Sequence, residues 1–306
     1  ALAARPHPDG GTVLVTGGAD HRVRAFRLGN GVRDADTEPL WEGRHSEAVH
    51  AVTVGSVDGA AGGFHVVVSG SDDGSARVWD LDRGGLVGVP YTGHGGWVRA
   101  VAVRRFSDGT KVVSGGADGA VHIWELTRSG PVRGPFEGHA RTVRALTATS
   151  HQGTDLLLSG SLDGTVRQWD AVSGADRGEF LAGGWAGASD WIGALAAVEV
   201  GGGTSVVTAG QSGVRVFREG QRPQTLPGHT GWVGSLVEAD LGDSPAVVAA
   251  GYDGVPRVWN VATAGQHSCY GGPGEASAHA APVHALALVD GSADGVGPNV
   301  VSAGGD

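Results

Sequence analysis

"SGSLDGTVRQWD", residues 159–170, occurs in variant form three more times along the chain. The related stretches are SGSDDGSARVWD (69–80), SGGADGAVHIWE (114–125) and AAGYDGVPRVWN (249–260). Each stretch places an Asp-Gly pair between two short runs rich in apolar residues. Asp-Gly is a strong local signal for a tight turn between antiparallel strands. Each stretch is therefore predicted to form a β-hairpin.

The hairpins belong to repeats of about 45 to 50 residues, which is the range expected of repeat architectures. Within the repeat that begins at His139, four short segments follow one another: 142–148, 155–160, 165–170 and 177–183. A sheet of four such strands is too small to bury its own faces, so neighbouring sheets must stack. Most of the repeats open with a histidine, namely His45, His94, His139, His229 and His279. Gly184 stands where the histidine of the fifth repeat is missing.

Composition narrows the class of protein. The 56 glycines and the short β-branched runs, without any long 3.6-residue periodicity, indicate an all-β chain. The net charge of −10 disfavours nucleic acid and anionic membranes as partners and favours neutral or basic ones. The single Cys269 excludes an intrachain disulfide and fits a reducing compartment, so we expect a cytoplasmic protein.

The spacing from Gly-His to Trp-Asp resembles that of the WD-repeat β-propeller family, including its bacterial members. Gly-His stands at 93–94, 138–139 and 228–229, and Trp-Asp at 79–80 and 169–170. The resemblance implies a propeller of four-stranded antiparallel blades, seven by family habit and six as the alternative, with residues 1–306 as one domain. The first and last repeats are expected to be incomplete, with a second strand at 12–18 opening the chain and the two chain ends pairing within one blade. The expected repeats are 12–44, 45–92, 93–137, 138–183, 184–227, 228–277 and 278–306.

The resemblance also implies a hydrogen-bonded tetrad of His, Ser, Asp and Trp in each well-formed blade. Leaving such groups buried without partners would cost roughly 1–3 kcal/mol each. The fifth repeat has Phe217 for Trp, the sixth has Ala249 for Ser, and the first has Thr16, Asp20 and Phe26. The expected complete sets are His45, Ser69, Asp73 and Trp79; His94, Ser114, Asp118 and Trp124; His139, Ser159, Asp163 and Trp169.

Ser, His and Asp together also suggest a hydrolase, but a catalytic triad forms one exposed site, whereas these residues recur about every 45 positions along the chain. The sequence contains no G-x-S-x-G, H-E-x-x-H or G-x-x-x-x-G-K motif. His45 and His50 would lie on opposite faces of a strand, which argues against a metal site. We therefore expect a protein without catalytic residues, metal or cofactor.

The most informative positions are those where the repeats differ. In the family, the start of the first strand and the residue before the turn Asp lie on the top face. Aromatic and Arg side chains are enriched at binding hot spots. We expect the following residues to form a partner-binding rim: Trp97, Arg99, Arg144, Leu162, Trp191, Trp232 and Tyr252. An Arg two positions before the third-strand aromatic recurs in most repeats and is interpreted as structural.

These features favour a noncatalytic platform that binds a protein or peptide through its top face, with Arg99 and Arg144 available to pair with carboxylates. Partner identity and oligomeric state are not encoded in these patterns. The alternative is a regulatory or sensory segment of a larger enzyme, such as a kinase or protease, because the sequence has no Met and stops within a repeat. A third reading, catalysis on a small molecule in the propeller channel, would need a unique cluster of carboxylates or histidines, and the sequence does not indicate one.

Overall fold

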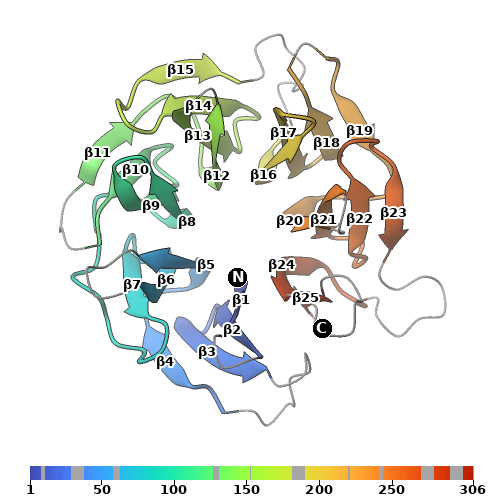
Figure 1. The fold of residues 1–306 in the computed structure, drawn as a ribbon. Coiled ribbons are helices and arrows are strands. Elements are labelled where there is room, and N and C mark those ends of the chain that lie inside the picture. Colours follow the sequence, from blue (N-terminus) through green and yellow to red (C-terminus); the bar gives the residue numbers. More distant parts are fainter. Residues whose placement is uncertain are drawn as a thin grey trace. The chain divides into compact units, whose positions relative to one another are not determined.

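Among the residues that the structure describes, the regular structure is β throughout, as the sequence predicts (Figure 1). The computed structural model describes residues 1–7, 11–28, 38–57, 63–126, 131–151, 153–180, 190–219, 221–240, 244–269, 279–289 and 299–305. Within these ranges, 25 strands form seven antiparallel sheets. Six sheets are blades of three or four strands, and the seventh has two strands. The described residues include no helix with the length and hydropathy needed to cross a membrane.

The chain divides into two compact units, of which unit 1 comprises Ala1–Ser161 and Val166–Phe180. It holds four sheets, each built of strands that follow one another in sequence. The first sheet contains β1 (Leu2–Pro6), β2 (Thr12–Gly17), β3 (Arg22–Leu28) and β4 (Trp41–Arg44), and the second contains β5 (Val49–Val57), β6 (Phe64–Ser71) and β7 (Ala76–Asp80). The third contains β8 (Val98–Phe106), β9 (Gly109–Gly116), β10 (Val121–Trp124) and β11 (Pro131–Phe136), and the fourth contains β12 (Val143–His151), β13 (Thr154–Ser161), β14 (Val166–Asp170) and β15 (Asp176–Glu179).

Unit 2 comprises Leu162–Thr165 and Leu181–Asp306. Its first sheet contains β16 (Ile192–Val200), β17 (Gly203–Gly210), β18 (Gly213–Phe217) and β19 (Gln224–Leu226). The next contains β20 (Val233–Asp240), β21 (Pro245–Gly251), β22 (Arg257–Asn260) and β23 (Gln266–Cys269). The two-stranded sheet pairs β24 (Val283–Val289) with β25 (Asn299–Gly304), so among the described residues the last repeat is incomplete, as expected.

The predicted Asp-Gly hairpins join the second and third strands of four sheets. The glycine of each turn has a positive φ, a conformation that a residue with a side chain adopts only under strain. These angles are 77° at Gly74, 77° at Gly119, 85° at Gly164 and 72° at Gly254. The turn glycine therefore sets the register of the two strands that carry the repeated Ser and Trp.

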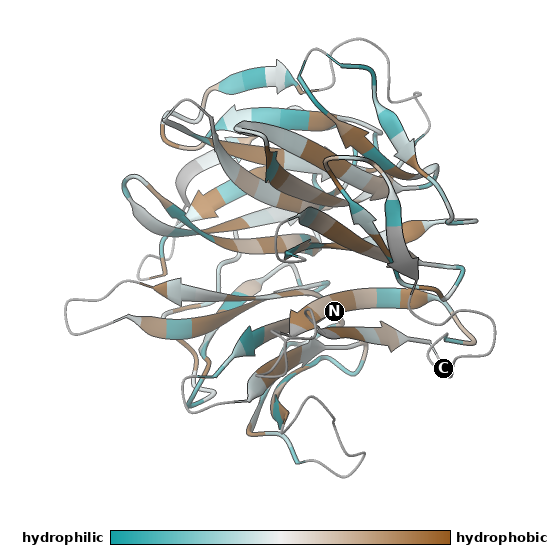
Figure 2. Ribbon diagram, turned by 45° about the vertical axis from the view of Figure 1, so that its right-hand side comes forward, coloured by the Kyte–Doolittle hydropathy of each residue, from teal (hydrophilic) through white to brown (hydrophobic). Residues whose placement is uncertain are grey.

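Apolar residues run along the strands and alternate with hydrophilic ones, which lets neighbouring sheets pack face to face (Figure 2). In unit 1, the Trp of each third strand also stacks on an aromatic side chain from the segment that ends the preceding repeat. The ring centroids are 6.2 Å apart for Trp41 and Trp79, 4.9 Å for Tyr91 and Trp124, and 5.6 Å for Phe136 and Trp169. Such a pair adds about 0.5–1.5 kcal/mol beyond its area burial.

The first sheet corrects the expectation that the first repeat is incomplete. Strand β1 pairs antiparallel with β2, from Leu2 opposite Thr16 to Pro6 opposite Thr12. The sequence LAARP lacks the apolar run expected of a strand, and it forms one because β2 offers an open edge. The expected pairing of the two chain ends within one blade is also wrong for the described residues, because β1 and β25 belong to different sheets.

The second sheet has no regular fourth strand in the described residues. Two isolated bridges, Ala76 with Tyr91 and Trp79 with Leu86, take the place of the outer strand. The segment still supplies Tyr91 to the core, where it is 1% exposed.

A prediction follows for Gly43 on β4, which lies against the face of Trp79. A Cβ added at Gly43 would stand 2.5 Å from Trp79 Cζ3, closer than real contacts allow. Gly43→Ala is therefore expected to lower the free energy of unfolding by about 1–3 kcal/mol through overpacking. Urea unfolding measures this, with Gly85→Ala as control because nothing lies within 4 Å of a Cβ there. Equal stability of the two variants would contradict the packing described.

Candidate functional site

The second sheet assembles the expected tetrad completely. His45 Nε2 lies 2.8 Å from Ser69 Oγ, and His45 Nδ1 lies 3.0 Å from Asp73 Oδ2. Trp79 Nε1 donates to Ser69 Oγ at 2.8 Å. Each polar side chain of this tetrad thus has a hydrogen-bond partner, which offsets the cost of burying it.

The third sheet repeats this geometry, and the fourth repeats its Trp–Ser–His part. Ser114 Oγ accepts from Trp124 Nε1 at 3.2 Å and lies 2.9 Å from His94 Nε2. Ser159 Oγ accepts from Trp169 Nε1 at 2.8 Å and lies 2.7 Å from His139 Nε2. His94 Nδ1 is 3.1 Å from Asp118 Oδ2.

The three tetrad serines are 0% exposed, so no substrate can reach their hydroxyl groups: Ser69, Ser114 and Ser159. Each Ser oxygen already binds an indole N–H and an imidazole. A nucleophilic serine needs an accessible oxygen beside an oxyanion hole. The tetrads therefore act as structural links within the sheets.

The turn Asp residues of the second and third sheets are held ionised by their surroundings. Burial alone would raise the pKa of Asp73, but hydrogen bonds from Ser75 and the charge of His45 outweigh it and hold the pKa far below its usual range. For Asp118 the same balance, with the hydrogen bond from His94 foremost among the lowering causes, brings the pKa to about 2. Both carboxylates also accept a backbone N–H from the residue after the tetrad His, 3.1 Å from Ser46 N and 2.8 Å from Gly95 N.

In three sheets the recurrent Arg of the third strand pairs with the turn Asp, whereas in the fourth sheet Arg167 pairs with Asp176 of β15 at 2.9 Å. Arg24 lies 2.7 Å from Asp20, Arg77 3.4 Å from Asp73, and Arg257 2.6 Å from Asp253. In the fifth sheet, where Ser212 replaces the turn Asp, Arg215 pairs instead with Asp190 at 2.9 Å. Gly184, the expected substitute for the fifth histidine, lies outside the described residues.

The third sheet has His122 where other sheets have this Arg. Its Nδ1 lies 2.5 Å from the Tyr91 hydroxyl group, and its ring lies 4.2 Å from the ring of His94. Burial, followed by the charge of His94, lowers the pKa of His122 to about 4. Burial, followed by the charge of Asp118, raises the pKa of Tyr91 to about 12.

His94, Asp118 and His122 offer ligand atoms within 4.8 Å of one another, a grouping that could hold a metal ion. Both ring nitrogens of His94 already take part in the tetrad, and His122 Nδ1 is engaged with Tyr91. A metal ion would have to displace these hydrogen bonds. The described contacts explain the cluster as a variant of the tetrad.

The sixth sheet lacks the tetrad serine. Ala249 stands in its place, and Trp259 Nε1 donates to Pro227 O at 3.2 Å instead. His229 Nδ1 keeps its contact with Asp253 at 2.9 Å, but its buried Nε2 has no hydrogen-bond partner among the described residues. This sheet therefore carries one unsatisfied polar group that the complete tetrads do not.

In unit 1, the predicted rim residues Trp97 and Arg99 contact each other. Trp97 is 52% exposed, and the Arg99 guanidinium carbon lies 4.6 Å from the centroid of its ring. Arg99 Nη2 also lies 3.1 Å from Asp72 Oδ1, and His50 Nε2 lies 3.0 Å from Asp72 Oδ2. The positive charge of Arg144 on β12 contributes to lowering the pKa of His50, after burial and Arg99. Arg99 thus has a carboxylate partner within the chain, which the sequence reading did not foresee.

In unit 2, aromatic side chains gather where the first strands begin. The rings of Trp191 and Trp232 are 6.0 Å apart and inclined by 70°, and the rings of Tyr252 and His284 are 6.1 Å apart and inclined by 87°. The two pairs are joined because Tyr252 N donates to Trp232 O at 2.8 Å. Trp191 is 40% and Tyr252 58% exposed. We call Trp191, Trp232, Tyr252 and His284 the aromatic surface. Leu162, the other rim residue of this unit, is half-buried in its turn.

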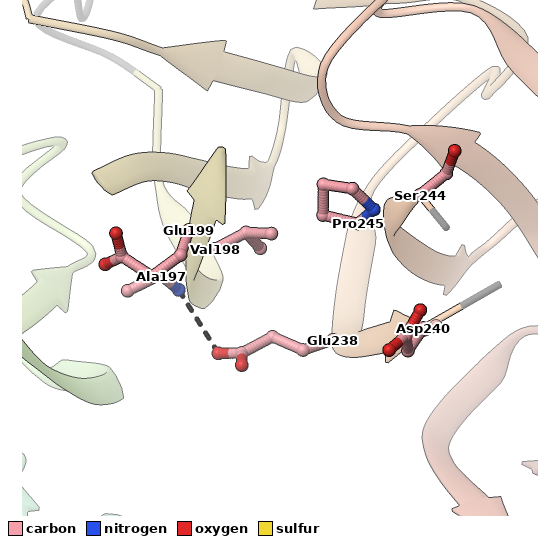
Figure 3. A pocket seen from close by; sticks show the side chains of 8 residues that line it. Ala197, Val198, Glu199, Glu238, Asp240, Ser244 and Pro245 are labelled. Carbon is pink, nitrogen blue, oxygen red and sulfur yellow. Dashed lines mark hydrogen bonds between the residues drawn. The ribbon is translucent and has the colours of Figure 1, made fainter. Parts of the chain in front are cut away.

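A groove that the sequence reading missed lies at the opposite ends of β16 and β20 (Figure 3). Ala197, Val198 and Pro245 line it together with three acidic residues, Glu199, Glu238 and Asp240. Glu238 Oε1 accepts from Ala197 N at 3.2 Å, the dashed line of Figure 3. We call this the acidic groove. Its sequence signal is a carboxylate near the end of each of two successive first strands.

The first prediction from this geometry concerns the missing serine. Ala249→Ser should restore an acceptor for Trp259 and a partner for His229, and so raise the free energy of unfolding by about 1 kcal/mol. Ala250→Ser is the control, because Ala250 packs in an apolar cluster with Val283 and Leu286 and the new hydroxyl group would stay unsatisfied. Urea unfolding of both variants measures the effect, and a destabilised Ala249→Ser protein would contradict it.

The second prediction concerns pH. The unfolded chain binds a proton at His122 near the ordinary pKa of 6.5, whereas the folded protein binds it only near pH 4. Acid therefore favours the unfolded state in this window, and His122 should remove on the order of 2–3 kcal/mol of stability as pH falls from 6.5 to 4. Unfolding of the wild-type protein and of His122→Gln at successive pH values measures it. The wild-type curve should fall more steeply, and parallel curves would refute the assignment.

Comparison with known proteins agrees with this geometry. Residues 43–80, 85–125, 130–170 and 220–260, more than half of the chain, match the WD domain, G-beta repeat. Each matched segment ends at the residue after the third-strand Trp. It therefore contains all four positions of the tetrad. No curated protein sequence matches the chain significantly. The chain belongs to the WD40 repeat family, and its fold is that of an all-β WD40 propeller.

Proposed function

We propose that the protein is a noncatalytic platform that binds a protein or peptide partner, with the aromatic surface of unit 2 as its main contact. WD40 propellers commonly serve as protein-binding scaffolds. The observation that carries the proposal is the grouping of exposed aromatic side chains at one edge of adjacent sheets, outside the tetrads. Such side chains are the commonest anchors of protein interfaces.

The surroundings of these residues support a recognition role. Trp191 and Tyr252 are exposed although each is joined to a partner ring, so burial against the sheets does not account for them. The other large exposed apolar side chains, such as Leu86 and Val89, have no comparable aromatic grouping around them. Trp97, with Arg99 beside it, offers a further contact in unit 1.

The rigid sheets would present these residues with little loss of conformational entropy. Two torsion angles orient a Trp or Tyr side chain, and ring-to-ring contacts already restrict them here. The hydrogen-bonded four-stranded sheets β16–β19 and β20–β23 fix the strands beside which the contact residues lie. A partner would therefore meet a preorganised surface.

The test compares partner capture by matched variants. The double variant Trp191→Ala/Tyr252→Ala should retain at least about tenfold less partner than the wild type, because truncation of a hot-spot residue costs 1–3 kcal/mol or more. Leu86→Ala/Val89→Ala removes exposed apolar surface elsewhere and serves as control. Captured proteins are identified by mass spectrometry, and direct binding is then measured with each purified candidate.

Thermal unfolding of both variants establishes that the fold is retained. Equal loss of partner in the two double variants would indicate nonspecific apolar adsorption. Full retention by Trp191→Ala/Tyr252→Ala would reject the aromatic surface as the contact.

A further inference from the structure

The tryptophans that precede the first strands differ between the two units in the residue that follows two positions later. Arg99 follows Trp97, and its guanidinium group lies 4.6 Å from the Trp97 ring centroid. A cation over an indole face at this distance is attracted by the negative face of the ring. In unit 1, the chain thus supplies its own cation to an exposed Trp.

In unit 2, glycine holds the corresponding position after both tryptophans, Gly193 after Trp191 and Gly234 after Trp232. A Cβ at Gly193 would lie 2.8 Å from Trp232 Cζ2, and a Cβ at Gly234 would lie 2.8 Å from Trp232 Nε1. The Trp232 indole therefore occupies the space that a side chain at either position would need. An arginine placed as Arg99 is placed cannot exist beside Trp232.

Three of the four arginines of unit 2 contact groups other than these rings. Arg215 pairs with Asp190 at 2.9 Å, and Arg257 pairs with Asp253 at 2.6 Å. Arg218 donates to the carbonyl oxygens of Val261 and Ala262. Among the described residues, no arginine side chain stacks on Trp232 or Tyr252 in the way that Arg99 stacks on Trp97.

The charge of unit 2 favours a cation from outside. The residues of unit 2 include twelve Asp and Glu but only four Arg and no Lys, a net charge of −8 of the −10 carried by the whole chain. Acidic surroundings raise the local concentration of cations and speed the approach of a basic partner. The aromatic surface thus combines exposed ring faces with a negative field.

We propose that the aromatic surface of unit 2 binds the guanidinium groups of an arginine-containing basic segment of a partner protein. The bound arginine would be the intermolecular counterpart of Arg99 on Trp97, with Trp232 and Tyr252 as the principal rings. This inference rests on the proposed function and specifies the chemistry of the partner. Unit 1 contrasts with it, because its tryptophan already has an intramolecular cation.

The probe is a fluorescein-labelled nonapeptide, Gly-Ser-Arg repeated three times, titrated with the full-length protein and followed by anisotropy. Its matched control replaces each Arg by citrulline, which keeps the shape of the side chain and removes its charge. We expect the Arg peptide to bind at least about tenfold more tightly. Equal binding of the two peptides would overturn the proposal.

Substitutions at Tyr252, which is 58% exposed, distinguish the contribution of the aromatic ring from that of side-chain volume. Tyr252→Phe keeps the aromatic face and should retain binding, whereas Tyr252→Leu removes it and should weaken binding about 3- to 10-fold. Trp232→Ala should weaken binding at least as much, with thermal unfolding as the check on its fold. Trp97→Ala should leave the affinity unchanged, and a loss equal to that of Trp232→Ala would overturn the assignment to unit 2.

The acidic groove is the competing site for a basic peptide in the same unit. The triple variant Glu199→Gln/Glu238→Gln/Asp240→Asn removes three charges that the bound peptide would not touch. It should therefore weaken binding only slightly, and raised ionic strength should abolish the difference from the wild type. If this variant abolishes binding while Tyr252→Leu does not, the groove is the site and the proposal is wrong.

The outcomes also separate this inference from the proposed function. If Trp191→Ala/Tyr252→Ala loses its captured partner but arginine and citrulline peptides bind alike, the surface binds proteins and only the cationic specificity fails. If that double variant keeps its partner, the proposed function itself fails.

Discussion

The buried indole N–H of the third-strand tryptophan is the constraint on which the architecture depends. Trp124, Trp169 and Trp259 are among the largest fully buried side chains, and each carries a donor that water cannot reach. In the second, third and fourth sheets, a serine oxygen on the neighbouring strand accepts a hydrogen bond from this N–H. Because His and Asp then hold the serine and the turn, one buried donor fixes the hairpin, the turn and the approach to the first strand together.

The hydrogen bond of the indole N–H also determines how neighbouring sheets pack. Once its N–H is anchored, the indole has one orientation, and Trp41, Tyr91 or Phe136 of the preceding repeat can stack on it. The fifth sheet shows the converse. Phe217 has no N–H to satisfy, so neither a tetrad His nor a turn Asp is required there. Arg215 pairs there with Asp190, which lies just before β16, in place of a turn Asp.

The features that the sequence could predict are those that repeat at fixed spacing. The hairpins, the tetrads and the structural role of the recurrent Arg depend on residues within one repeat, so their spacing is enough. Strand β1 was missed because its five residues form a strand only through the edge that β2 presents. The partner of Arg99 was missed because Asp72 belongs to a neighbouring sheet. The role of Gly193 was missed for the same reason, since it serves the indole of Trp232 in the next repeat.

The fifth and sixth sheets, which both depart from the tetrad, carry Trp191, Trp232 and Tyr252 of the aromatic surface. In complete tetrads, the turn carboxylate accepts the backbone N–H of the residue after the His and so fixes the path into the first strand. In the fifth sheet, Asp190 lies on that path itself, directly before Trp191, and binds Ser212 of the turn. In the sixth, Asp253 still accepts the backbone N–H of Thr230, and the indole of Trp232 fills the space beside Gly193 and Gly234. Loss of the tetrad is therefore not what exposes these rings, since Trp97 is exposed beside a complete tetrad, and the glycines next to Trp232 are what make room for its indole.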